Sequence, residues 1–136
     1  VEIKLIIRGI CCLIPNLPEI SENIEAISII DKFLEHARVY YFKNNPKEKL
    51  YISSADLMPR NIDFRVEVGV PIVEKLLQKK ILNYLNLQLK DNQKSRFHDL
   101  EMSNEMKKDG TESSRSQIEI YKWIQSDYEE NLKNKK

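Results

Sequence analysis

The sequence lacks an excess of charge of either sign. Its 136 residues hold 22 Lys and Arg against 21 Asp and Glu, which gives a net charge of +1. Residues 1–72 carry 9 basic and 10 acidic side chains, and residues 73–136 carry 13 and 11. Proteins that bind nucleic acid or a membrane surface usually concentrate basic residues in one segment. The composition therefore argues against both classes, and no nucleic-acid partner is expected.

Long hydrophobic runs and cysteines that could pair are also missing. No apolar stretch approaches the roughly 18 residues that a membrane-spanning helix needs, and no signal peptide is recognisable. Cys11 and Cys12 are adjacent, so they cannot readily reach unstrained disulfide geometry. We expect both to be reduced, small, buried side chains, because no metal-ligand spacing surrounds them. These absences predict a cytoplasmic chain without a transmembrane segment and without metal ligands.

Internal repeats and low-complexity tracts are absent too, and the length suits one domain with one core. The sequence begins without Met, at the edge of an expected strand. We therefore expect it to be a piece of a longer, multidomain protein.

The apolar residues that are present predict an α/β fold with a mixed β-sheet of about five strands flanked by helices. Alternating β-branched and aromatic residues mark the strands, and Leu and Ile at spacings of three and four mark amphipathic helices. Strands are expected at residues 3–7, at 26–34 with a helical turn at its end, and at 36–42, 50–54 and 65–72, with at most one more near Phe97. Helices are expected at residues 73–89 and 116–132, the second opened by a capping box of Ser116 and Glu119.

The same alternation predicts the core and one polar face. We expect these residues to be buried: Leu5, Ile7, Val39, Tyr41, Val66, Val68 and Val70. On a strand that begins at His36, a period of two places His36 and Arg38 on one face. Arg8 follows the first strand, and ligands of α/β proteins gather at the carboxyl ends of strands. Because guanidinium groups suit phosphate and carboxylate, this pattern indicates an anion site.

Each of these residues also has a purely structural interpretation. Arg8 fits a surface ion pair, and most strand-edge histidines satisfy only a local hydrogen bond. Arg38 could pair with Glu35 or Glu67 instead of phosphate. The remaining polar residues are interpreted as an ion network of Arg60, Arg65 and Glu67, turn formers at Ser53 and Ser54, and a surface residue at His98.

Five stretches together resemble a known family. They are Arg8-Gly-Ile-Cys-Cys-Leu, Ser21-Glu-Asn-Ile, the run from Ile27 to His36, Tyr51-Ile-Ser-Ser-Ala-Asp56, and Arg60-Asn-Ile-Asp-Phe-Arg-Val-Glu-Val. They resemble the C-terminal catalytic domain of bacterial polyphosphate kinase, the enzyme that grows polyphosphate from ATP. The resemblance extends to Asp91-Asn92 and returns at Ser114-Arg-Ser-Gln117.

The resemblance implies roles for three residues. Arg8 matches the family's phosphate-contacting Arg, and His36 matches its second active-site His, and both bind ATP there. His36 is therefore the expected catalytic residue, and Arg38, on its face, an expected further phosphate contact. Neutral imidazole can take a proton near pH 7, and imidazolium can donate to phosphate oxygens.

The resemblance also implies partners and a division of labour. The family uses ATP and Mg2+, acts reversibly on ADP and polyphosphate, and is a homo-oligomer when full length. Its phosphorylated histidine lies in the preceding domain, and no stretch here matches it. Residues 1–136 would be the second phospholipase-D-like half of the catalytic region, with a polar loop region at 90–115, and alone they are expected to be inactive.

Two alternatives to the kinase are open, and departures from the phospholipase D pattern argue against phosphodiesterase chemistry. Phospholipase D domains place a Lys two residues after their His, where this chain has Arg38, and have Gly-Ser-x-Asn where it has Ser53-Ser54-Ala55-Asp56. The alternatives to the kinase are a phospholipase-D-like phosphodiesterase and a non-catalytic phosphate-binding module. Within the kinase pattern, the usual Arg, Gly, Trp and Thr are replaced by Ile14, Asn16, Leu57 and Pro59.

Overall fold

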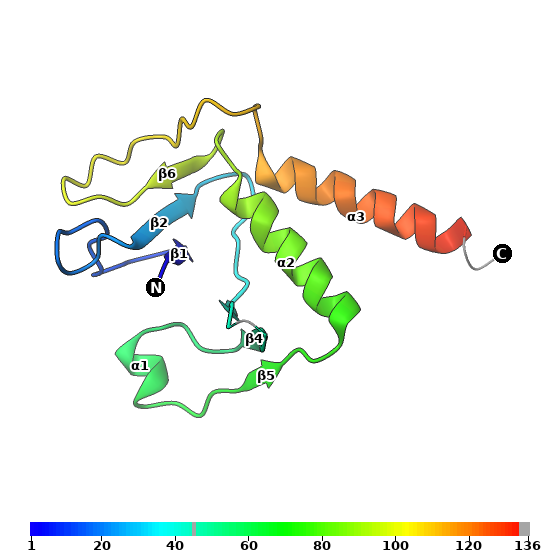
Figure 1. Cartoon of the computed structure of the whole chain (residues 1–136), viewed down its shortest axis with the longest axis horizontal. Coiled ribbons are helices and arrows are strands. Elements are labelled where there is room, and N and C mark those ends of the chain that lie inside the picture. The colour runs from blue at the N-terminus through cyan, green and yellow to red at the C-terminus, as the bar shows by residue number, and fades with distance from the viewer. Residues whose placement is uncertain (45, 134–136) are drawn as a thin grey trace. The chain divides into compact units, whose positions relative to one another are not determined.

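The computed structural model describes residues 1–44 and 46–133 and shows a mixed α/β chain (Figure 1). The chain forms two compact units, which we call unit 1 (Val1–Glu35 with Tyr84–Lys136) and unit 2 (His36–Asn83). The elements in chain order are β1 (Ile3–Ile6), β2 (Ile24–Ile29), β3 (Val39–Phe42), β4 (Lys49–Ser53), α1 (Pro59–Ile62), β5 (Gly69–Pro71), α2 (Lys75–Leu89), β6 (Ser95–Phe97) and α3 (Ser116–Lys133).

The single sheet of about five strands is wrong, because the strands form two sheets of three. In unit 1 the order is β1-β2-β6, with β2 parallel to β1 and antiparallel to β6. The central strand β2 is paired on both sides, and its Ala26 and Ile27 are buried. The short strand predicted near Phe97 is confirmed as β6.

Unit 2 contains the antiparallel sheet β3-β4-β5, whose central strand β4 carries the buried Leu50. Asn44, Asn45 and Pro46 predict a hairpin turn over residues 43–49, between β3 and β4. Asn45 lies outside the described residues. The first strand of this sheet begins at Val39 rather than at His36. Arg38 nevertheless continues the pairing with its carbonyl, which accepts a hydrogen bond from the Ser53 N–H at 2.9 Å.

The long strand predicted at residues 65–72 is wrong, since only Gly69–Pro71 pairs with β4. The short helix α1 and its turn occupy the chain before it, so the chain reaches the sheet late. β5 is an edge strand, and Val66, Val68 and Val70 are 100%, 59% and 44% exposed. Their predicted burial is therefore wrong, and the four other predicted core residues, Leu5, Ile7, Val39 and Tyr41, are only half-buried.

The two long helices are confirmed, but the capping box of α3 is wrong. α2 begins two residues later than predicted, at Lys75, and α3 begins at Ser116 as predicted. The Ser116 hydroxyl does not turn to the backbone of Glu119. It donates instead to Asp91 Oδ2 at 2.7 Å, and the same oxygen accepts from the Ser116 N–H at 2.7 Å. A carboxylate from the end of α2 thus supplies the N-terminal cap.

Two loops that depart from the kinase pattern have simple local explanations. Asn16 has a φ of 60°, in the left-handed region that favours Gly and that Asn tolerates better than most residues. Pro59 is the first residue of α1, where its missing N–H costs no hydrogen bond. Ile14 and Leu57 are exposed. The replacements therefore fit the loops in which they occur.

Two further expectations meet the structure in different ways. Cys11 and Cys12 have free thiols, but Cys11 is only half-buried and Cys12 is exposed, because their loop has no regular structure. The helical turn expected after β2 is absent, and residues 31–33 form bends.

Within residues 1–44 and 46–133, no helix has the length and apolar character needed to cross a membrane.

Candidate functional site

The two site residues predicted on one strand face in unit 2 do contact each other. The Arg38 Nη2 group donates a hydrogen bond to His36 Nε2 at 2.6 Å. His36 is exposed and Arg38 is half-buried. Because a guanidinium has no acceptor, His36 Nε2 must act as the acceptor, and the proton of the neutral ring then lies on Nδ1. The contact therefore selects one tautomer of His36.

The carboxylate that holds Arg38 was missed from the sequence. Arg38 Nε donates to Asp56 Oδ1 at 2.7 Å, and the two side chains are 23% and 24% exposed. Asp56 raises the pKa of the Arg38 guanidinium. Glu35 and Glu67 are the partners that the sequence offers for Arg38, whereas the β3–β4 pairing brings Asp56 to it. One end of the guanidinium is thus fixed, and the other is directed at His36.

The loop that carries Asp56 is held by short-range hydrogen bonds. The Ala55 N–H donates to Ser53 Oγ at 3.1 Å, and the Tyr40 hydroxyl donates to the Ala55 carbonyl at 3.3 Å. Burial raises the pKa of Tyr40, so this hydroxyl stays protonated. Ala55 itself is buried. Ser53 is therefore a turn former, as its structural interpretation predicted.

Glu67 accepts hydrogen bonds from neutral side chains and does not form the predicted ion network with Arg60 and Arg65. It accepts hydrogen bonds from the Ser54 hydroxyl and from Asn61 Nδ2, the latter at 2.9 Å. These two bonds, the first above all, lower the pKa of Glu67. Arg65 adds only a longer-range attraction. The buried Asn61 Oδ1 has no hydrogen-bond partner in the part of the chain that the structure describes.

Arg8 lies in unit 1, directly beyond the paired end of β1, and is exposed. The residue before it is fixed on both sides of its backbone. The Ile7 N–H donates to the Ile27 carbonyl at 2.8 Å, and the Ile7 carbonyl accepts from Ser28 Oγ at 2.6 Å. Arg8 therefore extends from an anchored strand end, as the sequence predicted.

His98 is more than the surface residue that was expected. It is half-buried, and its Nε2 lies 2.6 Å from Ser28 Oγ. Because the Ser28 hydroxyl gives its only proton to the Ile7 carbonyl, His98 Nε2 must be the donor. The expectation failed because β2 and β6, which bring Ser28 and His98 together, are remote in sequence. His98 thus supports the strand end that carries Arg8.

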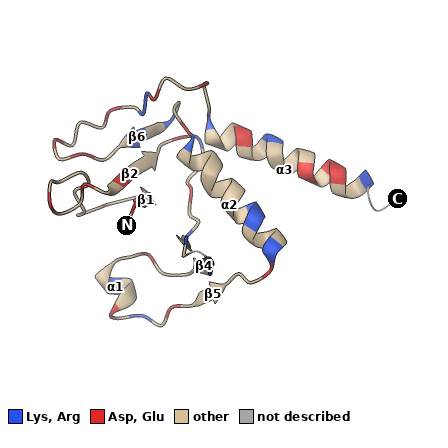
Figure 2. Cartoon of the chain, in the orientation of Figure 1, with Lys and Arg blue, Asp and Glu red and all other residues tan. Residues whose placement is uncertain are grey.

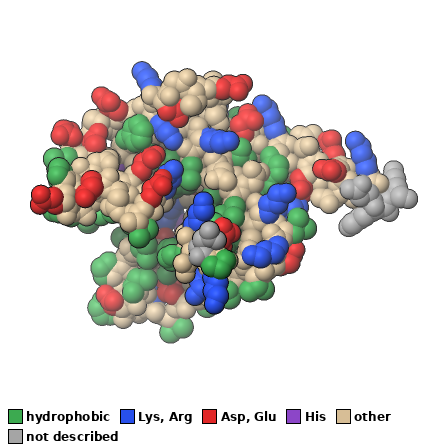
Figure 3. Space-filling model, in the orientation of Figure 1, with side chains coloured by type: hydrophobic (Ala, Val, Ile, Leu, Met, Phe, Trp, Pro, Cys, Tyr) green, Lys and Arg blue, Asp and Glu red, His purple; other side chains and the backbone are tan. Residues whose placement is uncertain are grey.

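Charge is divided unevenly between the units (Figure 2). Unit 2 has nine Lys and Arg against five Asp and Glu, whereas unit 1 has thirteen against sixteen. A split of the sequence at residue 72 concealed this difference. The unit that holds His36 and Arg38 is therefore the basic one. Apolar side chains are also exposed on the surface of the molecule (Figure 3).

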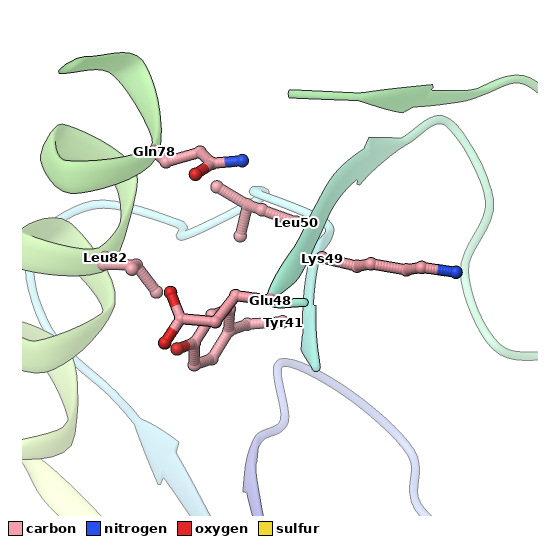
Figure 4. Close-up of a pocket in the computed structure, with 6 residues that line it drawn as sticks. All are labelled: Tyr41, Glu48, Lys49, Leu50, Gln78 and Leu82. Carbon is pink, nitrogen blue, oxygen red and sulfur yellow. The ribbon is translucent and has the colours of Figure 1, made fainter. Parts of the chain in front are cut away.

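A hollow in unit 2 lies away from these residues. It is lined by Tyr41, Glu48, Lys49, Leu50, Gln78 and Leu82. Figure 4 shows Gln78 and Leu82 extending from α2 toward β4, while the Lys49 ammonium points away. Burial raises the pKa of Tyr41. This hollow is a gap in the packing of helix on sheet and contains none of the predicted site residues.

Metal ligands are not gathered anywhere in the described chain. Among residues 1–44 and 46–133, no group of three or more His, Cys, Asp or Glu side chains could hold a metal ion. The His36, Arg38 and Asp56 cluster can instead bind and orient an anion, with two nitrogen-based groups on one surface and a carboxylate behind them. Arg8 offers a second cationic group, in the other unit.

Comparisons with known proteins point to one family. The family model described as polyphosphate kinase C-terminal domain 2 matches residues 1–117. The polyphosphate kinase of Staphylococcus epidermidis is 56% identical over 99 residues, which cover 73% of this chain and 14% of that protein. The polyphosphate kinase of Escherichia coli K12 is 46% identical over 127 residues, which cover 93% and 18%.

A solved structure matches the fold closely. The crystal structure of polyphosphate kinase from Porphyromonas gingivalis superposes with a TM-score of 0.90 at 40% identity, over 95% of this chain and 20% of that one. The chain thus spans a fifth or less of these relatives' length. On this evidence, the chain belongs to the polyphosphate kinase C-terminal domain 2 family.

Proposed function

We propose that this chain is the C-terminal part of a polyphosphate kinase that reversibly transfers the terminal phosphoryl group of ATP to polyphosphate. In the forward direction, a histidine in a preceding domain attacks the γ-phosphorus, and ADP leaves. The terminal oxygen of polyphosphate then attacks the phosphohistidine, which lengthens the polymer by one unit and frees the histidine. Residues 1–136 act as the second phospholipase-D-like half of this catalytic region, in a homo-oligomer.

The observation that supports this proposal most strongly is the hydrogen-bonded trio of His36, Arg38 and Asp56. Phosphoryl transfer depends on positioning and on stabilising charge that spreads over the phosphoryl oxygens. A guanidinium fixed by Asp56 at one end can stabilise that charge with little reorganisation. The positive balance of unit 2 favours a polyanionic substrate on the same unit.

Each site residue has a distinct role in this proposal. Arg8 contacts the phosphates of ATP, and Arg38 contacts the phosphoryl oxygens. His36, whose Nε2 lone pair is held toward Arg38, exchanges its contact with the guanidinium for one with the phosphoryl group. Protonated there, its imidazolium donates a hydrogen bond to the transferred oxygens, and neutral it accepts a proton from them.

Mg2+ is the metal ion that the family implies, and the residues that the structure describes offer no closed site for it. Mg2+ commonly binds through substrate phosphates and only one or two carboxylates. The described residues contain no cluster of three ligating side chains. We therefore assign no step on this chain to the ion.

The test is ATP-dependent polyphosphate synthesis by the full-length protein that contains this chain. The proposal expects synthesis, and expects ATP formation from polyphosphate and ADP. Cleavage of phosphodiesters without synthesis would instead identify a phospholipase-D-like enzyme. Phosphate binding without either reaction would identify a non-catalytic phosphate-binding module.

A further inference from the structure

The segment that leads to His36 leaves β2 without regular structure. After Ile29 it makes one backbone hydrogen bond of the kind that sheets use, from the Ile30 N–H to the Lys94 carbonyl at 3.1 Å. Phe33 and Leu34 are 65% and 73% exposed, so apolar burial does little to hold it. Residues 31–35 therefore need another source of order.

Gln117, on the first turn of α3, supplies much of it. Its Oε1 accepts a hydrogen bond from the Phe33 N–H at 3.1 Å, and its Nε2 donates to the Phe33 carbonyl at 2.7 Å. The primary amide thus bonds both backbone groups of Phe33, as a neighbouring strand would. This contact joins positions 84 residues apart in sequence and lies wholly within unit 1.

The carboxylate of Glu35 is fixed by two donors. Gln117 Nε2 donates to Glu35 Oε1 at 3.0 Å, and the Tyr84 hydroxyl donates to Oε2 at 2.8 Å. Gln88 Nε2 in turn donates to the Tyr84 hydroxyl at 3.0 Å. Burial, and then the bond with Glu35, raise the pKa of Tyr84, so the hydroxyl remains a donor at neutral pH.

A bidentate ion pair holds the beginning of the same segment. Arg115 donates through Nε and Nη2 to the two oxygens of Asp31 at 2.8 and 2.6 Å, and the Asp31 side chain is 2% exposed. Arg115 lowers the pKa of Asp31. The residue after Arg115 is itself fixed, because Asp91 accepts both the N–H and the hydroxyl of Ser116. The segment is therefore bonded to a rigid helix start.

We propose that Arg115, Gln117 and Tyr84 are positioning residues for His36 in phosphoryl transfer. They hold the chain from Asp31 to Glu35, and His36 is the next residue, so its backbone begins from a restrained point. This inference rests on the proposed function, because it requires that His36 acts on the phosphoryl group. It assigns a function to Arg115 and Gln117 of the Ser114-Arg-Ser-Gln117 motif. It also explains why hydrogen bonds and an ion pair are concentrated on a loop whose apolar side chains are exposed.

The test uses the full-length kinase with Gln117→Ala and Tyr84→Phe, each of which removes contacts to the segment without touching His36. Because small misplacements of a catalytic group are costly, we expect kcat to fall about tenfold or more in Gln117→Ala. The KM for ATP should change less than about twofold, since binding contacts made elsewhere remain. Tyr84→Phe removes one donor to Glu35 and should show a smaller loss of kcat.

A paired variant and a matched control separate positioning from general destabilisation. Gln117→Glu places a second carboxylate beside Glu35, and adding Glu35→Gln restores a donor between the two positions. We expect the double variant to recover part of the kcat that Gln117→Glu loses. Lys122→Ala, which breaks only the exposed pair with Glu119 further along α3, should leave kcat unchanged.

Hydrogen exchange of the Phe33 amide reports the contact directly. Exchange should accelerate in Gln117→Ala and stay slow in Lys122→Ala. Accelerated exchange with an unchanged kcat overturns the positioning role and leaves the proposed function intact. A wild-type kinase that makes no polyphosphate from ATP overturns the proposed function, and this inference with it.

Discussion

At the scale of single residues, the site in unit 2 is a chain of three groups, each of which restricts the next. Asp56 Oδ1 accepts a hydrogen bond from Arg38 Nε, and Arg38 Nη2 donates to His36 Nε2. An arginine without this carboxylate would keep the rotamer freedom of a long side chain. The loss of that conformational entropy would then weaken substrate binding. The Arg38 guanidinium is therefore held in place before an anion binds.

Replacing His36 by Ala in the full-length kinase should reduce turnover far more than it weakens ATP binding. A group that transfers a proton, or donates a hydrogen bond mainly in the transition state, contributes about 10²–10⁴-fold to the rate. The measurement is steady-state kcat and KM together with direct ATP binding. Normal turnover with only a raised KM would make His36 a binding residue and refute its proton-transfer role.

The stability of the chain should depend on Asp109 at acid pH. Hydrogen bonds from Thr111, and then from Asn92, lower the pKa of Asp109 to about 2, below the roughly 3.9 of an unfolded Asp. A lowered folded pKa means that the stabilisation is complete above the unfolded pKa and disappears as the pH falls toward 2. The melting-temperature difference between wild type and Asp109→Asn should therefore shrink from pH 5 to pH 2. A difference that does not change with pH would contradict this.

How far the sequence predicts the site depends on how local each contact is. A period of two predicts a shared face for His36 and Arg38. The strand begins only at Val39, but the two side chains do contact each other. The pairing of Arg38 with Asp56 depends on the β3–β4 register, in which Val39 lies opposite Ile52. No local pattern encodes that register. The same reason explains why His98 and Ser28 were not paired.

At the scale of elements, the helices and central strands were predictable because their periodicity lies in consecutive residues. β5 was not, because the sequence pattern of Val66, Val68 and Val70 suits a strand while the preceding α1 turn delays pairing until Gly69. The start of α3 shows a similar limit. Ser116 and Glu119 have capping-box spacing, yet Asp91, 25 residues earlier, takes the hydroxyl.

Asp91 should be one of the most sensitive positions for folding. Its side chain is fully buried and accepts from the N–H groups of Gln93, Lys94, Ser95 and Ser116 and from the Ser116 hydroxyl. Asp91→Ala leaves these donors without their acceptor, and the Ser95 N–H and both Ser116 donors are buried. We expect a loss of about 3 kcal/mol or more in the free energy of unfolding.

Ser116→Ala is the matched control for Asp91→Ala. It removes one hydroxyl donor and leaves the backbone cap in place, so the loss should be about 1 kcal/mol. Urea denaturation at neutral pH measures both variants. Equal losses in the two variants would show that the backbone bonds of Asp91 add little.

At the scale of the whole molecule, the two units differ in charge more than the two halves of the sequence do. Unit 2 is basic and unit 1 is slightly acidic, although the chain as a whole is nearly neutral. The net charge of the chain therefore gave no sign of a polyanionic partner. The basic character of unit 2 appears only when the charged residues are assigned to the two units. The two predicted anion contacts, Arg8 and Arg38, belong to different units.

This division leads to a prediction for the chain on its own. Sulfate, phosphate or polyphosphate should raise its melting temperature, since a ligand at ten times its Kd stabilises the folded state by about 1.4 kcal/mol. We expect Arg8→Ala to remove most of this gain and Arg38→Ala part of it. Lys122→Ala is the neutral control, because it breaks only the exposed pair with Glu119.

Added salt should reduce the gain in melting temperature, because exposed charges are screened over a Debye length of about 8 Å at physiological ionic strength. Polyphosphate should raise the melting temperature more than phosphate does at equal phosphorus concentration, since one polymer can bind several cationic groups at once. Differential scanning fluorimetry at several NaCl concentrations measures both effects. A gain that persists in both arginine variants, or that salt does not diminish, would place anion binding on other residues and remove Arg8 and Arg38 from the phosphate site.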